Sequence, residues 1–334
     1  MSKFFKVASR VLATVLIAAG LILTFSTFTQ NTPKKLNIMF IAKSSASNFW
    51  KTAFKGAHAA ANEYNVNISI RSPQNEDDYI TQNELLQWGI DNKVDAIIFS
   101  ACDYDRSVHM AESAIDAGIT LISIDSPINS KRIDMFTGTD NLAAGAKAAA
   151  ELALRTGYKG VVGVINCEEA GAVGMQREKG FVDELKKYTA MQVVDIRYTA
   201  SNIEDPKQKT LKMLEEHPEI NAIAAFNEWA TLGVGAALQQ LSEPLKGDAR
   251  MEFCQKYSII GFDTNVLSIE QLEDGILDAL IVQNPFAMGY LGVQQAIEYK
   301  KTTKHTAFTD TGTTVITSEN MYDSENQKLL FPFS

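Results

Sequence analysis

The feature that most constrains the fold of this chain is a regular alternation of short apolar runs and longer helix-like segments. Apolar runs bounded by polar or turn residues are typical of buried parallel strands. Examples are LNIMFIA (36–42), ITLISID (119–125) and YSIIGFD (257–263). Segments with helical spacing separate such runs, for example NFWKTAFKGAHAAANEY (48–64). Strands that alternate with helices predict βαβ units, so the sequence predicts an α/β fold with parallel sheets.

The same alternation occurs twice along the chain, which predicts two doubly wound parallel-sheet lobes. A length of 334 residues suits two domains, because domains usually contain about 100–200 residues. We expect lobe 1 to comprise 36–139 and 284–312, and lobe 2 to comprise 140–283 and 313–334. Several crossings between the lobes would form a multi-strand hinge, with a ligand cleft that closes by hinge bending.

The N-terminal 35 residues have the pattern of an export signal. A basic cluster within residues 1–10 precedes an uncharged segment, 11–33, that is close to the length needed to cross a bilayer. The basic residues predict a cytoplasmic N-terminus and an exported body. No cysteine occurs before Cys102, which excludes a lipid-modified N-terminal cysteine, and small residues at a cleavage position are poorly placed. We expect 1–35 to be a signal-anchor helix plus linker that attaches an extracytoplasmic protein to the outer face of the cytoplasmic membrane. The alternative is a cleaved signal peptide and a secreted or periplasmic protein.

Composition excludes several other classes of protein. The net charge of -9 and the lack of a basic stripe argue against a nucleic-acid partner. The three cysteines are far apart and show no metal-ligand spacing, so we predict free thiols, no metal site and no cofactor. No pairing of a nucleophile with a base can be identified, which predicts that the protein is not an enzyme.

Polar and aromatic residues follow the predicted strands at the ends where ligands bind in open α/β sheets. The aromatic pair Phe49-Trp50 follows the first strand, and Asp125, Asn227, Asp263 and Gln283 follow four later ones. Carboxylates and amides bind hydroxyl groups, and the apolar faces of a sugar ring pack on aromatic rings. These residues predict a cleft for a small polyhydroxylated ligand.

The chain from about Leu36 onward resembles type-I periplasmic (extracytoplasmic) solute-binding proteins of the ribose, galactose and xylose group. The resemblance rests on IGFD (260–263), the strand-end Asp125, the N-E-x-A run (227–230) and Q-N-P (283–285). It implies that a small sugar binds between the lobes, with its ring between the aromatic side chains and its hydroxyls on the aspartates. It also implies delivery of the sugar to the permease of an ABC importer. A protein anchored by its N-terminus could instead be a sugar sensor that signals to a membrane histidine kinase.

Some positions differ from the ribose-binding pattern. Ser126 and Met175 stand where ribose binders carry arginines, and Ser47 replaces an asparagine before the aromatic pair. Lys43, together with Asp125-Ser126, is similar to the branch that binds rhamnose or a furanose quorum-sensing signal, in which a strand-end lysine contacts ligand hydroxyls. A charge at the rim of the cleft is the alternative role for Lys43. The acidic pair Glu168-Glu169 has no predicted partner, so we expect it on the solvated surface.

Overall fold

The computed structural model describes residues 14–15, 17, 35–133, 135–299 and 306–331 of the chain. In these residues the strands form two six-stranded sheets with the same connectivity, ordered β2-β1-β3-β4-β5-β11 and β7-β6-β8-β9-β10-β12. The first sheet contains β1 (Asn37–Ile41), β2 (Asn67–Arg71), β3 (Ala96–Phe99), β4 (Thr120–Ile124), β5 (Phe136–Gly138) and β11 (Phe308–Asp310). The second contains β6 (Lys159–Asn166), β7 (Ala190–Tyr198), β8 (Ala222–Ala225), β9 (Ser258–Phe262), β10 (Ala279–Gln283) and β12 (Thr313–Ile316). The two lobes confirm the predicted fold class.

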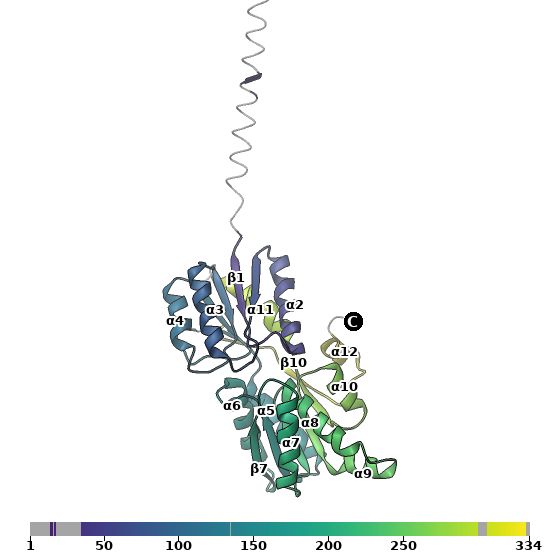
Figure 1. The fold of residues 1–334 in the computed structure, drawn as a ribbon. Helices are drawn as coiled ribbons and strands as arrows, with labels where there is room; N and C mark the ends of the chain where they lie inside the picture. Colours follow the sequence, from purple (N-terminus) through teal and green to yellow (C-terminus); the bar gives the residue numbers. More distant parts are fainter. Residues whose placement is uncertain (1–13, 16, 18–34, 134, 300–305, 332–334) are drawn as a thin grey trace, which may run out of the picture. The chain divides into compact units, whose positions relative to one another are not determined.

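Helices cover both faces of each sheet, and Figure 1 shows them in their layers. Around the first sheet lie α2 (Asn48–Glu63), α3 (Tyr79–Asp91), α4 (Val108–Asp116) and α11 (Pro285–Tyr299). Around the second lie α5 (Asn141–Arg155), α6 (Ala172–Leu185), α7 (Glu204–Glu216), α8 (Glu228–Ser242) and α10 (Val266–Glu273). The remaining helices, α9 (Asp248–Lys256) and α12 (Ser324–Leu330), follow α8 and β12 in the chain. Each helical layer buries its own apolar cluster against its sheet.

The chain passes between the lobes after β5, after β10 and between β11 and β12. The paired strands of both sheets run parallel, except that β12 runs antiparallel to β10. β12 begins at Thr313, opposite Gln283 at the end of β10, directly after the short link from β11, so the chain enters the second sheet at the carboxyl end of its strands and runs back along β10. The assignment of residue ranges to lobes and the bending of these segments as a hinge stay predictions.

The predicted signal-anchor helix falls in 1–35, which lies outside the described residues except for Thr14, Val15, Ile17 and Lys35. Across the described part of the chain, no helix combines the length and apolar character needed to span a membrane.

Glycines allow the closest helix contacts in both lobes. A Cβ atom at Gly56 of α2 would lie 2.0 Å from the carbonyl oxygen of Phe286 in α11. In the second lobe, a Cβ at Gly145 of α5 would lie 2.1 Å from the carbonyl oxygen of Arg177 in α6. Both distances are far inside van der Waals contact, so α2 with α11 and α5 with α6 can pack at this separation only where the side chain is absent.

We predict that Gly145→Ala destabilises the protein. Alanine has the higher helix propensity by about 1 kcal/mol, but overpacking against a backbone carbonyl costs about 1–3 kcal/mol, because a carbonyl cannot move away as a flexible side chain can. Urea unfolding should show a lower unfolding free energy. The control is Ala143→Gly at an exposed position of the same helix, where a loss of at most about 1 kcal/mol is expected. A Gly145→Ala protein as stable as the wild type would contradict the close packing of α5 and α6.

Candidate functional site

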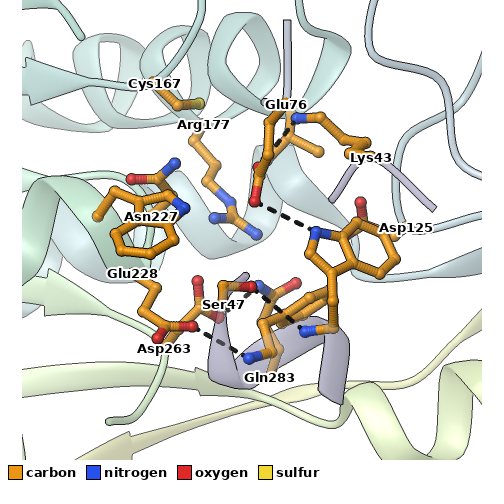
Figure 2. A pocket seen from close by; sticks show the side chains of 14 residues that line it. Lys43, Ser47, Glu76, Asp125, Cys167, Arg177, Asn227, Glu228, Asp263 and Gln283 are labelled. Atoms are coloured by element: carbon orange, nitrogen blue, oxygen red, sulfur yellow. Dashed lines mark hydrogen bonds and ion pairs between the residues drawn. The ribbon is translucent and has the colours of Figure 1, made fainter. Parts of the chain in front are cut away.

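A cavity of about 370 Å³ lies where the carboxyl ends of the two sheets meet, and side chains from both lobes line it (Figure 2). That volume includes the solvent-filled mouth of the cavity, so the enclosed space suits a single small molecule at most. The lining residues are Lys43, Ser47, Phe49, Trp50, Glu76 and Asp125 from the first lobe, and Cys167, Val173, Arg177, Asn227, Glu228, Trp229, Asp263 and Gln283 from the second.

All of the site residues predicted from the sequence line this cavity except Ser126 and Met175. Ser126 is fully buried next to Asp125, and its hydroxyl has no hydrogen-bond partner among the described residues. Met175 is 42% exposed on α6. The residue of α6 that reaches the cavity is Arg177, because two residues along a helix turn the side chain by about 200°. The match of Met175 to an arginine position of ribose binders stays a prediction, and in this structure Met175 does not line the cavity.

The strand-end aspartates occupy equivalent places in the two lobes. Asp125 follows β4 with φ 56° and Asp263 follows β9 with φ 64°, both in the left-handed region. The backbone N–H of Asp125 donates to the carbonyl of Thr137 at 3.0 Å, and the backbone N–H of Asp263 donates to the carbonyl of Ile281 at 3.1 Å. A non-glycine residue in this region costs about 1–3 kcal/mol and is concentrated at functional sites. The left-handed backbone conformation turns both carboxylates toward the cavity at the carboxyl ends of the strands.

Each aspartate is buried and holds a partial set of hydrogen bonds. Asp125 accepts a bond from the hydroxyl of Ser100 at 3.0 Å, and Asp263 accepts one from the amide of Gln283 at 2.6 Å. Burial raises the pKa of both carboxyls. Because a carboxylate has about four acceptor positions, each aspartate retains capacity for hydroxyl donors.

The two predicted amides have local structural roles as well. The side chain of Asn227 caps α8 by accepting the N–H of Ala230 at 2.8 Å. Gln283 ends β10, accepts a bond from the hydroxyl of Thr139 at 2.7 Å and donates to Asp263. Gln283 therefore connects the first interlobe passage with the strand-end aspartate of the second lobe.

Phe49 and Trp50 open helix α2 and are both buried against the first-lobe core. Their rings meet edge to face, with centroids 5.0 Å apart and planes at 85°. Both adjacent side chains can be buried because the first turn of α2 borders the core and the cavity together. The indole N–H of Trp50 donates to Glu76 at 3.2 Å.

Lys43 is neither at the rim of the cleft nor free of protein partners. It is 3% exposed, and its ammonium group lies 3.5 Å from Glu76 and 3.3 Å from Glu168. Burial by itself would lower the pKa of Lys43, but the two carboxylates raise it well above its usual value. Glu168 follows β6 and is buried, so its predicted place on the solvated surface is wrong. Figure 2 shows Lys43 and Glu76 at one end of the cavity and Asp263 and Gln283 at the other.

Arg177 is the main site residue that the sequence analysis missed. It is 1% exposed, donates to Asn141 at 2.9 Å and to the carbonyl of Phe226 at 2.6 Å, and lies 4.3 Å above the ring of Phe262. Its position two residues after Met175 was visible in the sequence, but only helix phase decides which of the two faces the cavity.

Glu76, Glu228 and Trp229 also line the cavity but were not predicted as site residues, although Glu228 and Trp229 lie in the N-E-x-A run. Burial raises the pKa of Glu76 to about 7, and burial also raises that of Glu228. The indole nitrogen of Trp229 is shielded from solvent and has no hydrogen-bond partner among the described residues. A buried N–H without a partner costs about 1–3 kcal/mol, so Trp229 offers a free donor to any ligand in the cavity.

The chemistry of the cavity favours binding of a neutral polar molecule. Its lining combines four carboxyl groups, which accept bonds, with the donors of Arg177, Asn227, Trp229 and Gln283. Burial raises the pKa of the Cys167 thiol to about 12, which keeps it in the unreactive thiol form. A molecule with several hydroxyl groups and an apolar face matches this set of groups.

Comparison with known proteins identifies the family. Residues 38–304 match the model of the periplasmic binding protein domain. The D-ribose/D-allose-binding protein of Pseudomonas aeruginosa is 28% identical over 304 residues, which cover 88% of this chain and 92% of that protein. The D-allose-binding periplasmic protein of Escherichia coli is 24% identical, over 79% of this chain and 84% of that protein.

Solved structures agree with this result. A carbohydrate transporter solute-binding protein from Agrobacterium radiobacter, in complex with D-arabinose, has a TM-score of 0.83 and 28% identity, and the match covers 90% of this chain and 100% of that one. The glucose-galactose binding protein GanP from Geobacillus stearothermophilus has a TM-score of 0.78 and 26% identity, over 87% of this chain and 100% of that one. The relatives are binding proteins and not enzymes. The chain belongs to the periplasmic binding protein family.

Proposed function

We propose that the protein binds a single monosaccharide outside the cytoplasm, closes its two lobes around the sugar and delivers it to an ABC importer. The observation that carries the proposal is the set of buried carboxylates, amides and Arg177 that converges from both lobes on one small cavity. Aromatic side chains complete one wall, as sugar rings require. Relatives named for binding ribose, allose and arabinose support a pentose or hexose as the ligand.

The contacts of Lys43 favour a general pentose or hexose binder over the branch that binds rhamnose or a furanose signal. Two carboxylates already hold the ammonium group of Lys43. Arg177 supplies a cation from the second lobe, fixed by its bonds to Asn141 and to the carbonyl of Phe226. Lys43 then organises the charged end of the cavity, and the hydroxyl contacts fall mainly to Asp125, Asp263, Asn227 and Gln283.

A second candidate function is that of a membrane-anchored sugar sensor that signals to a histidine kinase. The uncharged segment 11–33 favours it, because a retained apolar anchor would keep the protein beside a membrane partner. N-terminal sequencing of the mature protein separates the two roles: a retained residue 1–35 segment supports the sensor, and a new N-terminus between Gln30 and Lys35 supports a released binding protein.

A thermal-shift panel tests the binding function. We expect one or more of D-ribose, D-allose, D-arabinose, D-galactose, D-xylose and L-rhamnose to raise the melting temperature of the full chain, because a ligand at 100 times its dissociation constant adds about 2.7 kcal/mol of stability. Sucrose and citrate serve as controls, since a disaccharide exceeds the cavity and an anion meets its carboxylates. No shift with any monosaccharide at 10 mM would contradict the proposal.

We predict that Asp125→Ala and Asp263→Ala each weaken sugar binding without unfolding the protein. Each carboxylate should accept bonds from sugar hydroxyls, and hydrogen bonds to charged groups contribute about 1.5–3 kcal/mol, or about one to two decades of affinity. Titration calorimetry measures the loss, with Asp274→Ala at an exposed helix end as the matched control. Unchanged affinity in both variants would remove the aspartates from the site.

We predict that Glu76 makes the unliganded protein less stable as the pH rises. Its pKa is about 7 in the folded protein and near 4.5 in the unfolded chain, so between these values the folded state binds more protons and the unfolding free energy falls with increasing pH. The difference in melting temperature, Glu76→Gln minus wild type, should therefore increase between about pH 4.5 and pH 7 and stay constant at higher pH.

Differential scanning calorimetry from pH 4.5 to pH 8 measures this difference. The control is Glu215→Gln, at an exposed position of α7, and the pH profiles of the two variants are compared. A difference for Glu76→Gln that is constant across the range would show that Glu76 titrates as an ordinary exposed carboxyl.

A further inference from the structure

The carboxylate of Glu228 crosses the cleft. Glu228 is the first residue of α8 in the second lobe, yet its Oε1 accepts the backbone N–H of Asn48 at 3.0 Å and its Oε2 accepts that of Phe49 at 3.0 Å. Asn48 and Phe49 begin α2 in the first lobe. Both oxygens of one carboxylate thus bind consecutive N–H groups of the other lobe.

Helix α2 needs this partner because its own N-terminus is incompletely capped. The first N–H groups of a helix have no partner within the helix. The side chain of Ser47 accepts the N–H of Trp50 at 3.3 Å, and the first turn of α2 contains no acidic residue. A negative charge at a helix N-terminus is stabilising, and Glu228 brings that charge from the second lobe.

Glu228 also stands in the first turn of its own helix, so its charge lies between the N-termini of α2 and α8. The residue is 4% exposed, and Asn265 donates a further hydrogen bond at 2.9 Å. Burial raises the pKa of Glu228, and the bonds from Phe49, Asn265 and Asn48 oppose that rise. With three donors on its two oxygens, Glu228 has most of its acceptor positions filled by protein groups.

The contact can form only while the lobes are closed, because its two sides belong to different lobes. It also fixes the first turn of α2, and that turn carries the aromatic pair Phe49 and Trp50 beside the cavity. A contact made in the closed state and absent from the open state shifts the equilibrium toward closure and so raises the apparent affinity for a ligand that requires closure.

We propose that Glu228 is a positioning residue for ligand binding: it clamps the N-terminus of α2 across the cleft, holds the aromatic pair in place and slows opening of the closed form. This inference rests on the proposed function, since it supposes that ligand binding and lobe closure are coupled. The neighbouring Asp263 contacts the ligand, whereas Glu228 acts through α2.

The test compares the full-length wild type with Glu228→Gln, and Glu204→Gln serves as the matched control. Glu204 is also a first-turn glutamate, but it lies on α7 with an exposed side chain. Binding kinetics of D-ribose, D-allose and D-arabinose are measured by stopped flow. Backbone hydrogen exchange of Asn48 and Phe49 is measured by mass spectrometry with and without sugar.

We expect Glu228→Gln to raise the dissociation rate about tenfold, because glutamine keeps one acceptor and loses the charge, while the association rate stays within about twofold. Saturating sugar should protect the amides of Asn48 and Phe49 in the wild type and in Glu204→Gln, and protect them less in Glu228→Gln.

A dissociation rate equal to that of the wild type would overturn the proposal. So would a raised rate with unchanged protection of Asn48 and Phe49, because that result would make Glu228 a direct ligand contact. If the wild type binds none of the three sugars, that result counts against the proposed function and not against the inference about Glu228. Amide exchange without sugar then decides on Glu228: faster exchange in Glu228→Gln supports the cross-lobe contact, and equal exchange contradicts it.

Discussion

The arrangement of the two lobes depends on the compensation of buried charge across the cleft. Carboxylates of one lobe find their partners on the other: Glu228 binds the N-terminus of α2, and Glu168 binds Lys43. Breaking such a contact by removing one partner leaves a buried charge uncompensated, at a cost of about 3–5 kcal/mol. Under the proposed hinge motion, water would solvate both sides of an open cleft, so these contacts would favour the closed form without locking it.

The two lobes share two structural features that position site residues. Each sheet ends a strand with an aspartate in the left-handed conformation, at Asp125 and at Asp263. Each packs a pair of helices through a glycine, at Gly56 and at Gly145, so that the helix bearing site residues lies close to its neighbour. The second pair matters for the site because Gly145 contacts the backbone of Arg177 itself. Repetition of these features places acceptors on both sides of the cavity.

The sequence predicted the fold class and most of the lining residues, because strand periodicity and strand-end position are local properties. Asp125, Asn227, Asp263 and Gln283 follow apolar runs and need no tertiary information to be recognised. The errors arose where tertiary packing decides. Helix phase separates Met175 from Arg177, and long-range pairing, not local sequence, buries Glu168 and Lys43. Glu76, in the loop after β2, and Trp229 reach the cavity only because the two lobes meet.

A crystal structure of the protein grown with the sugar that gives the largest thermal shift is the most direct test of this account. The account predicts one monosaccharide in the cavity between Asp125 and Asp263, with hydroxyls within hydrogen-bond distance of both carboxylates, an aromatic face of Phe49 or Trp50 against the ring, and Glu228 still bound to the N-terminus of α2. A sugar bound elsewhere, or one whose hydroxyls contact neither aspartate, would contradict it.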